Sequence, residues 1–155
     1  MTNTIVQEAQ QQDLNDYLDL LSDFHHASTI APFSKFDRQG CALFLENCIK
    51  NNDIGIWVAK LNGKIVGVTA ALVYPLYFSP THSVVQELWW WLTPEARGSG
   101  AGQMMYKQIE QWAKEKNAKS IFMIALEDEK ASKMEKVYNR SGFTALERTF
   151  IKEVA

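Results

Sequence analysis

Apolar side chains recur three and four positions apart in the first third of the chain. This spacing is typical of amphipathic helices that bury one face, and it predicts helices over residues 13–26 and 37–50, joined by an irregular segment. Asp13 is expected to be the N-cap of the first helix, because its carboxylate can accept a hydrogen bond from the first turn. The expected buried stripes are Leu14, Tyr17, Leu18, Leu21 and Phe24, then Cys41, Phe44, Leu45, Cys48 and Ile49.

The middle of the chain alternates between apolar runs of strand length and turn residues. Asn62-Gly63 separates two such runs, and this dipeptide between β-rich segments predicts a tight hairpin. A later run contains three consecutive tryptophans without alternating polar residues, so we expect a central strand that is covered on both faces. The expected elements are strands over 54–60 and 64–74, a loop over 75–83, and the tryptophan strand over 84–92.

The last third of the chain predicts a helix, a strand and a second helix. Helix 101–116 is expected to bury Met105, Ile109, Trp112 and Ala113. The order of all elements predicts an α/β fold, with a mixed β-sheet flanked by helices and one right-handed parallel crossover through residues 101–116. The remaining expectations are a strand over 120–126, a helix over 128–141 that turns Met134, Val137 and Tyr138 inward before Gly142, and one or two short edge strands in 143–154.

Composition limits the classes of protein that remain. The chain has 155 residues, 46% of them hydrophobic, so we expect a single domain over residues 1–155 that folds without metal or disulfides. A net charge of −2 gives no electrostatic footprint for nucleic acid or for an anionic membrane. No apolar run reaches the roughly 18 residues of a membrane span, and the N-terminus lacks a signal-peptide pattern. A cytoplasmic protein is therefore expected.

Glycine occupies every second position of the loop that follows the tryptophan strand, Arg97-Gly98-Ser99-Gly100-Ala101-Gly102. Such a loop at the start of a helix exposes main-chain amides, which bind anions together with the positive end of the helix dipole. Arg97 adds a positive charge. Gln103 stands where a P-loop needs lysine and where a dinucleotide-binding motif needs its third glycine. The loop therefore predicts a phosphate site of another kind, and a tight turn without a ligand is the alternative.

The segment Leu92-Thr93-Pro94-Glu95-Ala96-Arg97-Gly98-Ser99-Gly100-Ala101-Gly102 resembles the acyl-coenzyme A pyrophosphate loop of the GCN5-related N-acetyltransferase (GNAT) superfamily. A second element, Val137-Tyr138 followed by Gly142-Phe143, is similar to the Leu-Tyr-x-x-x-Gly-Phe block of that family. The order of the predicted elements also agrees, so the resemblance covers most of the chain. The tryptophan strand and the N-terminal half further resemble GNAT-like proteins that phages and prophages encode.

The resemblance implies a GNAT-like fold with acetyl-CoA as co-substrate. No metal is expected, because His25, His26 and His82 lack paired cysteine or acid spacing. Amides from Gly98 to Gln103 would hold the pyrophosphate, and the strand end would pair with pantetheine as an added strand. In this family that strand splays from its neighbour, here residues 121–126, and opens a slot for the thioester. One position departs from the pattern, because Ala131 replaces a frequent asparagine. The implied cofactor-binding residues are Trp90, Trp91, Leu92, Arg97, Gly98, Ser99, Gly100, Ala101, Gly102 and Gln103.

Acetyl transfer to an amine makes its own chemical demands. The amine attacks while neutral, yet a free lysine-type amine has a pKa near 10.4, so the site needs a base, and an acid for the departing thiolate. Glu87 is the candidate base because it is an acid inside an apolar strand, where its pKa is raised or it finds a partner. The resemblance implies Tyr138 as the acid. Simple alternation places Glu87, Trp89 and Trp91 on one face of the strand, unless a bulge breaks the parity.

Both catalytic candidates also have structural interpretations. Tyr138 fits a tyrosine with its ring in the core and its hydroxyl bonded elsewhere, and Glu87 fits a half-exposed strand residue paired with a cation. The expected function is direct transfer of acetyl from acetyl-CoA to a small-molecule or peptide amine, by a monomer or homodimer. Neither cysteine lies beside the loop, which favours a route without a covalent intermediate. The alternatives are a non-catalytic acyl-CoA-binding sensor or interaction module, and a structural protein that uses the glycine turn only for packing.

Overall fold

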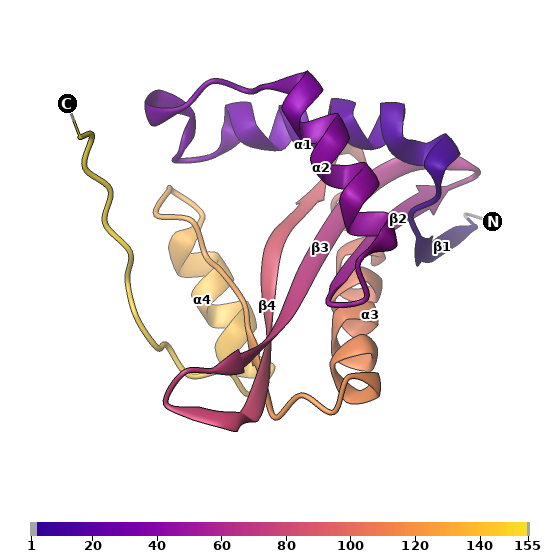
Figure 1. Ribbon diagram of the computed structural model, residues 1–155. Coiled ribbons are helices and arrows are strands. Elements are labelled where there is room, and N and C mark those ends of the chain that lie inside the picture. The colour runs from indigo at the N-terminus through magenta and orange to yellow at the C-terminus, as the bar shows by residue number, and fades with distance from the viewer. Residues whose placement is uncertain (1–2, 155) are drawn as a thin grey trace.

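Residues 3–154, which the computed structural model describes, form a mixed five-stranded β-sheet with helices on both faces (Figure 1). The strands follow one another across the sheet in chain order. Those from β1 to β4 are antiparallel to their neighbours, whereas β4 and β5 are parallel. This arrangement confirms the predicted mixed α/β sheet. The strands are β1 (Thr4–Glu8), β2 (Ile54–Leu61), β3 (Lys64–Leu76), β4 (Ser79–Leu92) and β5 (Ser120–Phe122).

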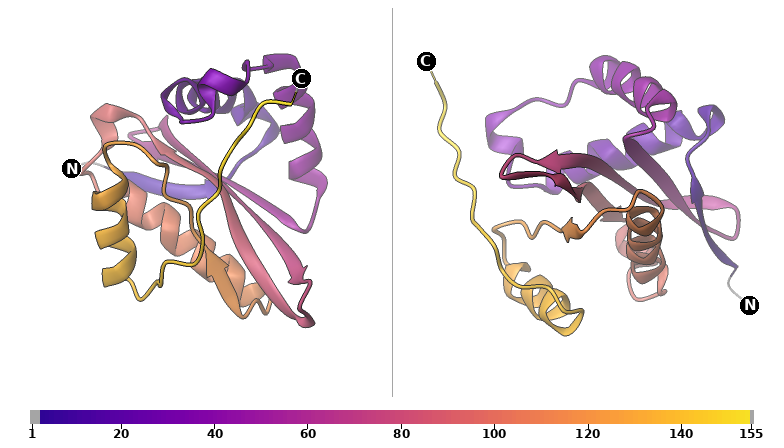
Figure 2. Two further views of the ribbon diagram at one scale, coloured as in Figure 1. Left: turned by 90° about the vertical axis from the view of Figure 1, so that its left-hand side faces the viewer. Right: turned by 60° about the horizontal axis from the view of Figure 1, so that its bottom comes forward.

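Helices α1 and α2 cover one face of the sheet, and α3 and α4 lie on the other, as the right-hand view of Figure 2 shows. The α3 helix connects β4 to β5 and makes the parallel crossover. Within residues 3–154, no helix is both long enough and apolar enough to cross a membrane. The helices are α1 (Leu14–Ala27), α2 (Arg38–Lys50), α3 (Ala101–Glu115) and α4 (Ala131–Arg140), with 3-10 turns at Gln11–Asp13, Ala31–Phe33 and Pro94–Ala96.

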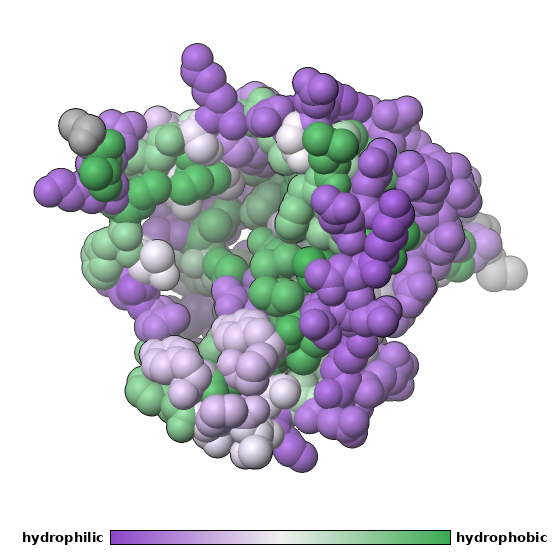
Figure 3. All heavy atoms as spheres, viewed as in Figure 1, coloured by the Kyte–Doolittle hydropathy of each residue, from purple (hydrophilic) through white to green (hydrophobic). Residues whose placement is uncertain are grey.

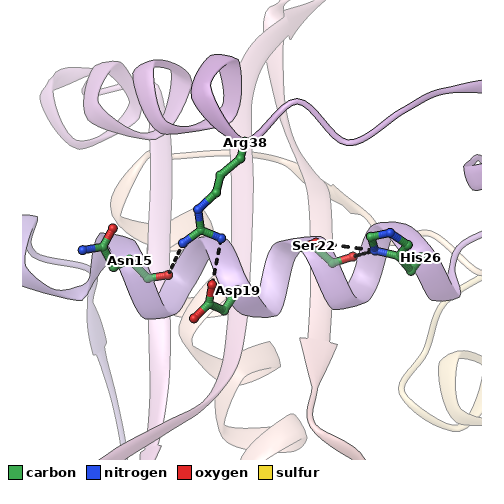
Figure 4. A network of polar contacts seen from close by, with 5 residues as sticks. All are labelled: Asn15, Asp19, Ser22, His26 and Arg38. Atoms are coloured by element: carbon green, nitrogen blue, oxygen red, sulfur yellow. Dashed lines mark hydrogen bonds and ion pairs between the residues drawn. The ribbon is translucent and has the colours of Figure 1, made fainter.

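The α1 and α2 helices are also joined at the surface. Arg38, at the start of α2, donates from its guanidinium to the Asp19 carboxylate (2.7 Å) and to the Asn15 carbonyl oxygen (3.3 Å) (Figure 4). Further along α1, the His26 ring donates from Nδ1 to the Ser22 carbonyl oxygen (2.7 Å). Such exposed pairs contribute only about 0–1 kcal/mol, so the packing of these helices depends on their buried faces.

Burial confirms most of the predicted helix faces. The whole predicted stripe of α3 is buried, and Ala101 is buried with it. In α2 the stripe is only half right, because Phe44 and Ile49 remain exposed while Leu45 and Cys48 are buried. The buried residues of α1 are Leu14, Tyr17, Leu18, Leu20 and Leu21, with Phe24 partly buried against them.

The predicted helix cap at Asp13 is wrong in its chemistry. Asp13 precedes α1, but its side chain makes no capping hydrogen bond to the helix. One carboxylate oxygen instead accepts from the Gln10 amide (2.8 Å), and the other lies 2.9 Å from the Lys60 ammonium. Asp13 is buried, and a charged partner lowers the cost of burying a carboxylate. A lysine on β2 therefore outcompetes the local helix amides.

The hairpin between β3 and β4 is longer than predicted. The expected loop over 75–83 is wrong, because both strands continue to a turn at Tyr77 and Phe78. The two strand ends lie outside the core, where exposed strand positions tolerate polar residues and prolines. These residues therefore resemble a loop in the sequence although their backbones pair. The β1 strand was not predicted at all. It pairs with β2 over five residues, and no turn residues frame it in the sequence.

The C-terminal third departs most from prediction. The β5 ladder ends at Phe122 instead of residue 126, and α4 begins at Ala131 instead of 128. The α4 helix has no fully buried residue, so its predicted inward face is only half-covered. Residues 143–154 form no strand and run away from the sheet (Figures 1 and 2). Figure 3 shows apolar residues gathered in a hollow between this tail and the body of the molecule. No described strand pairs with the tail, so the one or two edge strands expected in 143–154 are wrong.

One close contact in β2 yields a test of the core. A Cβ atom on Gly55 would overlap the six-membered ring of Trp57, which is 1% exposed. We expect Gly55→Ala to lower the free energy of unfolding by about 1–3 kcal/mol, because an overpacked core forces neighbouring groups to move. Urea denaturation would measure it. A stabilised variant, the usual effect where glycine only adds freedom to the unfolded chain, would contradict this packing.

Candidate functional site

The glycine loop adopts a backbone that requires glycine at two positions. Gly98 and Gly100 have φ of 83° and 88°, in the left-handed region that side chains disfavour. Gly100 is the N-cap of α3, and it has no side chain that could cap that helix. Among the hydrogen bonds of residues 3–154, none uses the amides of Gly98, Gly100, Gly102 or Gln103. The start of α3 therefore presents unpaired amides at the positive end of the helix dipole, which suits an anion.

Not every amide of the loop is free. The Ser99 amide donates to the Ala96 carbonyl oxygen (3.2 Å), and the Arg97 amide donates to that of Pro94 (3.3 Å). The Ala101 amide lies 3.3 Å from the Ser99 hydroxyl oxygen, a long hydrogen bond. These internal bonds shape the turn. The amides available to an anion are thus fewer than the continuous run expected from the sequence.

The third glycine is needed for packing. A Cβ atom on Gly102 would lie 3.1 Å from a Leu92 methyl group and 3.7 Å from the Trp90 ring. The first turn of α3 therefore approaches the end of β4 closely. Arg97 folds back over the same strand end, where its guanidinium lies 4.8 Å from the Trp91 ring centre and its Nε donates to the Leu92 carbonyl oxygen (3.3 Å).

The edge of β4 that faces β5 is paired over only three residues. The ladder joins Val84, Val85 and Gln86 to Ser120, Ile121 and Phe122, and then stops. On its other edge β4 stays paired with β3 as far as Leu92. The two central strands therefore part after Gln86, and the following backbone of β4 has no partner on that side within residues 3–154. An extended ligand could pair there as an added strand.

A β-bulge at Leu88 corrects the expected orientation of Glu87. Ala70 of β3 pairs with Trp89 and Ala71 pairs with Glu87, so Leu88 is the extra residue. Ala70 and Trp89 pack towards α1, whereas Ala71 packs towards α3. Glu87 thus faces the α3 side, opposite to Trp89, and the simple alternation was wrong at this point. Beyond the bulge, Trp90 and Leu92 pack on the α3 side with Glu87, and Trp91 packs on the α1 side with Trp89, so alternation holds from Trp89 onward but its expected relation to Glu87 is reversed.

Glu87 and Tyr138 meet at the backbone of one residue, Ile124. The Ile124 amide donates to Oε2 of Glu87 (3.0 Å), and the Tyr138 hydroxyl donates to the Ile124 carbonyl oxygen (2.7 Å). The carboxylate thus bridges the two strands just beyond the point where their ladder ends. Nothing in the sequence marks Ile124, because it takes part through main-chain atoms that every residue carries.

Burial controls the electrostatics of this pair. It raises the pKa of Glu87 from an ordinary 4.5 to about 7, and the hydrogen bond from Ile124 offsets part of that rise. The pKa of Tyr138 lies well above its ordinary value, first because of burial and then because of the nearby Glu87 charge. Glu87 is 4% exposed and has no cationic partner among the ion pairs of residues 3–154, so the alternative interpretation, a half-exposed glutamate paired with a cation, is wrong.

Contacts join the glycine loop to this carboxylate. The first turn of α3 packs on Trp90 through Gly102, and the Trp90 ring faces that of Tyr138 at 6.5 Å between centres. Tyr138 then contacts Ile124, which holds Glu87. The structure therefore brings the loop, the open β4 edge and both candidate catalytic residues into one continuous region. Residues 124 and 138 reach it from segments far along the chain.

Comparison with protein families identifies the class. Residues 14–143 match the model of the acetyltransferase (GNAT) family. The chain belongs to that family, as its loop and its Tyr…Gly-Phe block predicted. No curated protein sequence matches the chain. The similarity to phage-encoded members stays a prediction.

Solved structures share the fold at low sequence identity. An acetyltransferase from Trypanosoma brucei superposes with a TM-score of 0.74 at 18% identity, covering 98% of this chain and 100% of that one. A predicted acetyltransferase from Clostridium acetobutylicum, solved with acetyl-CoA, gives 0.73 at 19% identity, with coverage of 99% and 96%. The aminoglycoside N-acetyltransferase AAC(6')-Iy in complex with CoA gives 0.79 at 13% identity, with the same coverage.

The buried carboxyl of Glu87 makes stability depend on pH. Between pH 4.5 and about 7 it is ionised in the unfolded chain but protonated in the folded protein, so the unfolded state binds fewer protons and the free energy of unfolding falls as pH rises. We expect wild type to lose up to about 1.4 kcal/mol per pH unit relative to Glu87→Gln across this window. Urea denaturation at several pH values would measure the difference. Parallel stability curves for the two proteins would contradict a buried, neutral carboxyl.

Proposed function

We propose that this chain transfers an acetyl group from acetyl-CoA to a primary amine by direct nucleophilic attack. One observation carries the proposal: unpaired amides at the start of α3 adjoin a β4 edge that β5 leaves open. A CoA thioester combines a diphosphate, which suits those amides, with pantetheine amides, which suit an unpaired strand edge. Family membership supports the same pairing of site and ligand.

The fit of the diphosphate depends on glycine at three positions. Gly98 and Gly100 allow the turn, and Gly102 leaves room where a side chain would lie between α3 and β4. The amides of Gly100, Gly102 and Gln103 then supply donors without a competing cap. Arg97, above Trp91, adds positive charge at the rim of the loop.

Glu87 and Tyr138 divide the proton transfers between them. A base with a pKa of about 7 is matched to neutral pH, so ionised Glu87 can take a proton from the attacking amine, directly or through a water. The amine nitrogen bonds to the thioester carbonyl carbon, and the carbon–sulfur bond then breaks. Tyr138 keeps its proton because its pKa is high and donates it as the carbon–sulfur bond breaks, and the proton that Glu87 took from the amine then returns to the phenol oxygen and restores both groups. Cys48 lies in the α1-side core, which favours this direct route.

A small-molecule amine is the acceptor class that the similar structures favour. One is AAC(6')-Iy bound to a bisubstrate analogue, CoA-S-monomethyl-acetylneamine (TM-score 0.76). Another is an aminoglycoside acetyltransferase, meta-AAC0020, from an uncultured soil sample (TM-score 0.71). These proteins are 13% and 20% identical to this chain. Aminoglycosides and polyamines therefore lead the panel of amines to test.

One observation favours a second function, a non-catalytic acyl-CoA-binding module. Both candidate catalytic groups are hydrogen bonded to Ile124, an arrangement that also serves a purely structural role. Such a module would bind acetyl-CoA through the same loop without turning it over. The two functions differ in whether any amine is acetylated.

Binding at the loop can be tested without activity. Gln103 lies exposed in the first turn of α3, so Gln103→Glu should not destabilise the helix, whose N-terminus favours an acid. The added charge would repel the diphosphate, and about 1 kcal/mol of repulsion raises the Kd for CoA roughly fivefold. Calorimetry would measure it. Gln108→Glu, more than a turn further along α3, is the matched control, and equal Kd values for the two variants would place CoA elsewhere.

Turnover tests the catalytic roles. We expect Glu87→Gln and Tyr138→Phe each to lower kcat/KM for the amine on the order of 10²- to 10⁴-fold, the usual contribution of a general base or acid. The Kd for CoA should change little, because neither side chain lies in the loop. In wild type, kcat/KM should rise with pH through about 7, where Glu87 ionises. Glu135→Gln, an exposed change on α4, serves as the control. Full activity in either catalytic variant would refute its role.

A further inference from the structure

A closed ring of three hydrogen bonds lies directly beside the bulge in β4. The indole Nε1–H of Trp89 donates to the Tyr17 hydroxyl oxygen (2.7 Å), and that hydroxyl donates to the Thr69 carbonyl oxygen (2.9 Å). The Thr69 hydroxyl then donates to the Trp89 carbonyl oxygen (2.8 Å) and closes the ring. Tyr17 and Thr69 are fully buried and Trp89 is 8% exposed. The ring therefore joins α1, β3 and β4 inside the core.

The donors in this ring stay in place across the pH range in which the protein is folded. Burial raises the pKa of Tyr17 well above its ordinary value, so the hydroxyl keeps the proton that it donates to Thr69. The threonine hydroxyl and the indole N–H do not titrate in this range. The Tyr17 and Trp89 rings also meet edge to face, with centres 6.3 Å apart. Both side chains are thus held in one orientation.

Hydrophobicity alone does not specify where the bulge falls. Residues 88–91 read Leu-Trp-Trp-Trp, so a slip by one residue would replace one large apolar side chain by another on each face. The ring makes a sharper demand. It needs an indole N–H on the residue that pairs with Ala70, and that residue's carbonyl within reach of Thr69. Without the bulge Leu88 would pair with Ala70, and a leucine side chain offers no N–H to Tyr17, so the ring selects the bulged register over the regular one.

We propose that Tyr17, Thr69 and Trp89 fix the β4 bulge at Leu88 and thereby hold Glu87 on the side of the sheet where its carboxylate accepts from the Ile124 amide. These three are positioning residues, since they lie on the opposite face from Glu87 and act through the strand. Their importance for catalysis rests on the proposed function, whereas their effect on the position of Glu87 is independent of it.

Tyr17→Phe tests the ring with little change of volume. It removes the hydroxyl, so the buried Trp89 Nε1–H loses its acceptor and the Thr69 carbonyl oxygen loses a donor, which is costly. A shift of the strand would relieve this cost. Tyr74→Phe is the matched control, because the Tyr74 hydroxyl donates to the side chain of Gln86 (2.8 Å), next to Glu87 but outside the ring.

Amide hydrogen exchange, followed by NMR, reads the position of Glu87 directly. In Tyr17→Phe we expect the Ile124 amide to exchange about tenfold faster than in wild type, which corresponds to the loss of one hydrogen bond. The Val58 and Val68 amides, in the buried centre of the sheet, should change much less, and Tyr74→Phe should leave Ile124 protected. The proposal fails if Ile124 is accelerated no more than the two valines, or if Tyr74→Phe has the same effect.

A second pair of variants keeps the test open if Tyr17→Phe does not fold. Thr69→Ser retains the hydroxyl and should keep the exchange rate of Ile124, whereas Thr69→Val lacks it and should accelerate exchange. Equal protection in the two variants would overturn the proposal. A mere loss of core packing would accelerate exchange in both variants, because each changes the side chain at the same buried site.

Activity adds a readout that separates the two proposals. Tyr17→Phe should lower kcat for acetyl transfer on the order of 10- to 100-fold, the effect of a misplaced group, while KM for acetyl-CoA stays within about twofold. Wild type without turnover would refute the proposed function and leave the exchange result intact. Normal protection of Ile124 in Tyr17→Phe would refute the role of the ring, whatever the activity.

Discussion

The ladder between β4 and β5 stops after three residue pairs, and the site depends on that early stop. A longer ladder would occupy the edge of β4 at Trp90 and Leu92, beside the glycine loop, and no extended ligand could pair there. Where the ladder ends, the two strands still need one contact that fixes their positions relative to each other. The Glu87 carboxylate provides it by accepting from the Ile124 amide. A side chain thus takes the place of the next backbone hydrogen bond.

The cost of that contact explains its chemical character. A carboxyl group in the core is held without a cation, so its charged form is disfavoured and its pKa rises to about 7. The same burial that disfavours the ionised form gives Glu87 a pKa suited to a base at neutral pH. Tyr138 lies at the other side of Ile124, and its negative neighbour reinforces the retention of its proton. The structural contact and the proposed proton transfers therefore involve the same small group of atoms.

Periodicity predicted α1 and α3 well, because each buries a continuous stripe against the sheet. The loop was also predictable, since a left-handed backbone at Gly98 and Gly100 leaves glycine as the residue of choice. The bulge was not, because neighbouring apolar residues leave the register of β4 open. Ile124 contributes only main-chain atoms, which no pattern reveals. The strand signals in 143–154 misled for a different reason, because a short apolar segment forms a strand only when it pairs with a neighbour, and these residues pair with no described strand.

Three consecutive tryptophans beside the bulge have three different environments. Trp89 donates to a phenol in the core, Trp90 faces the aromatic ring of α4, and Trp91 lies beneath a guanidinium. Substituting one of them alters one environment. Deleting one would leave β4 without the residue that the bulge accommodates, so either the bulge at Leu88 or the pairing of Leu92 with Gly67 would be lost. A substitution in this run is therefore a local change, whereas a deletion changes the geometry of the whole strand end.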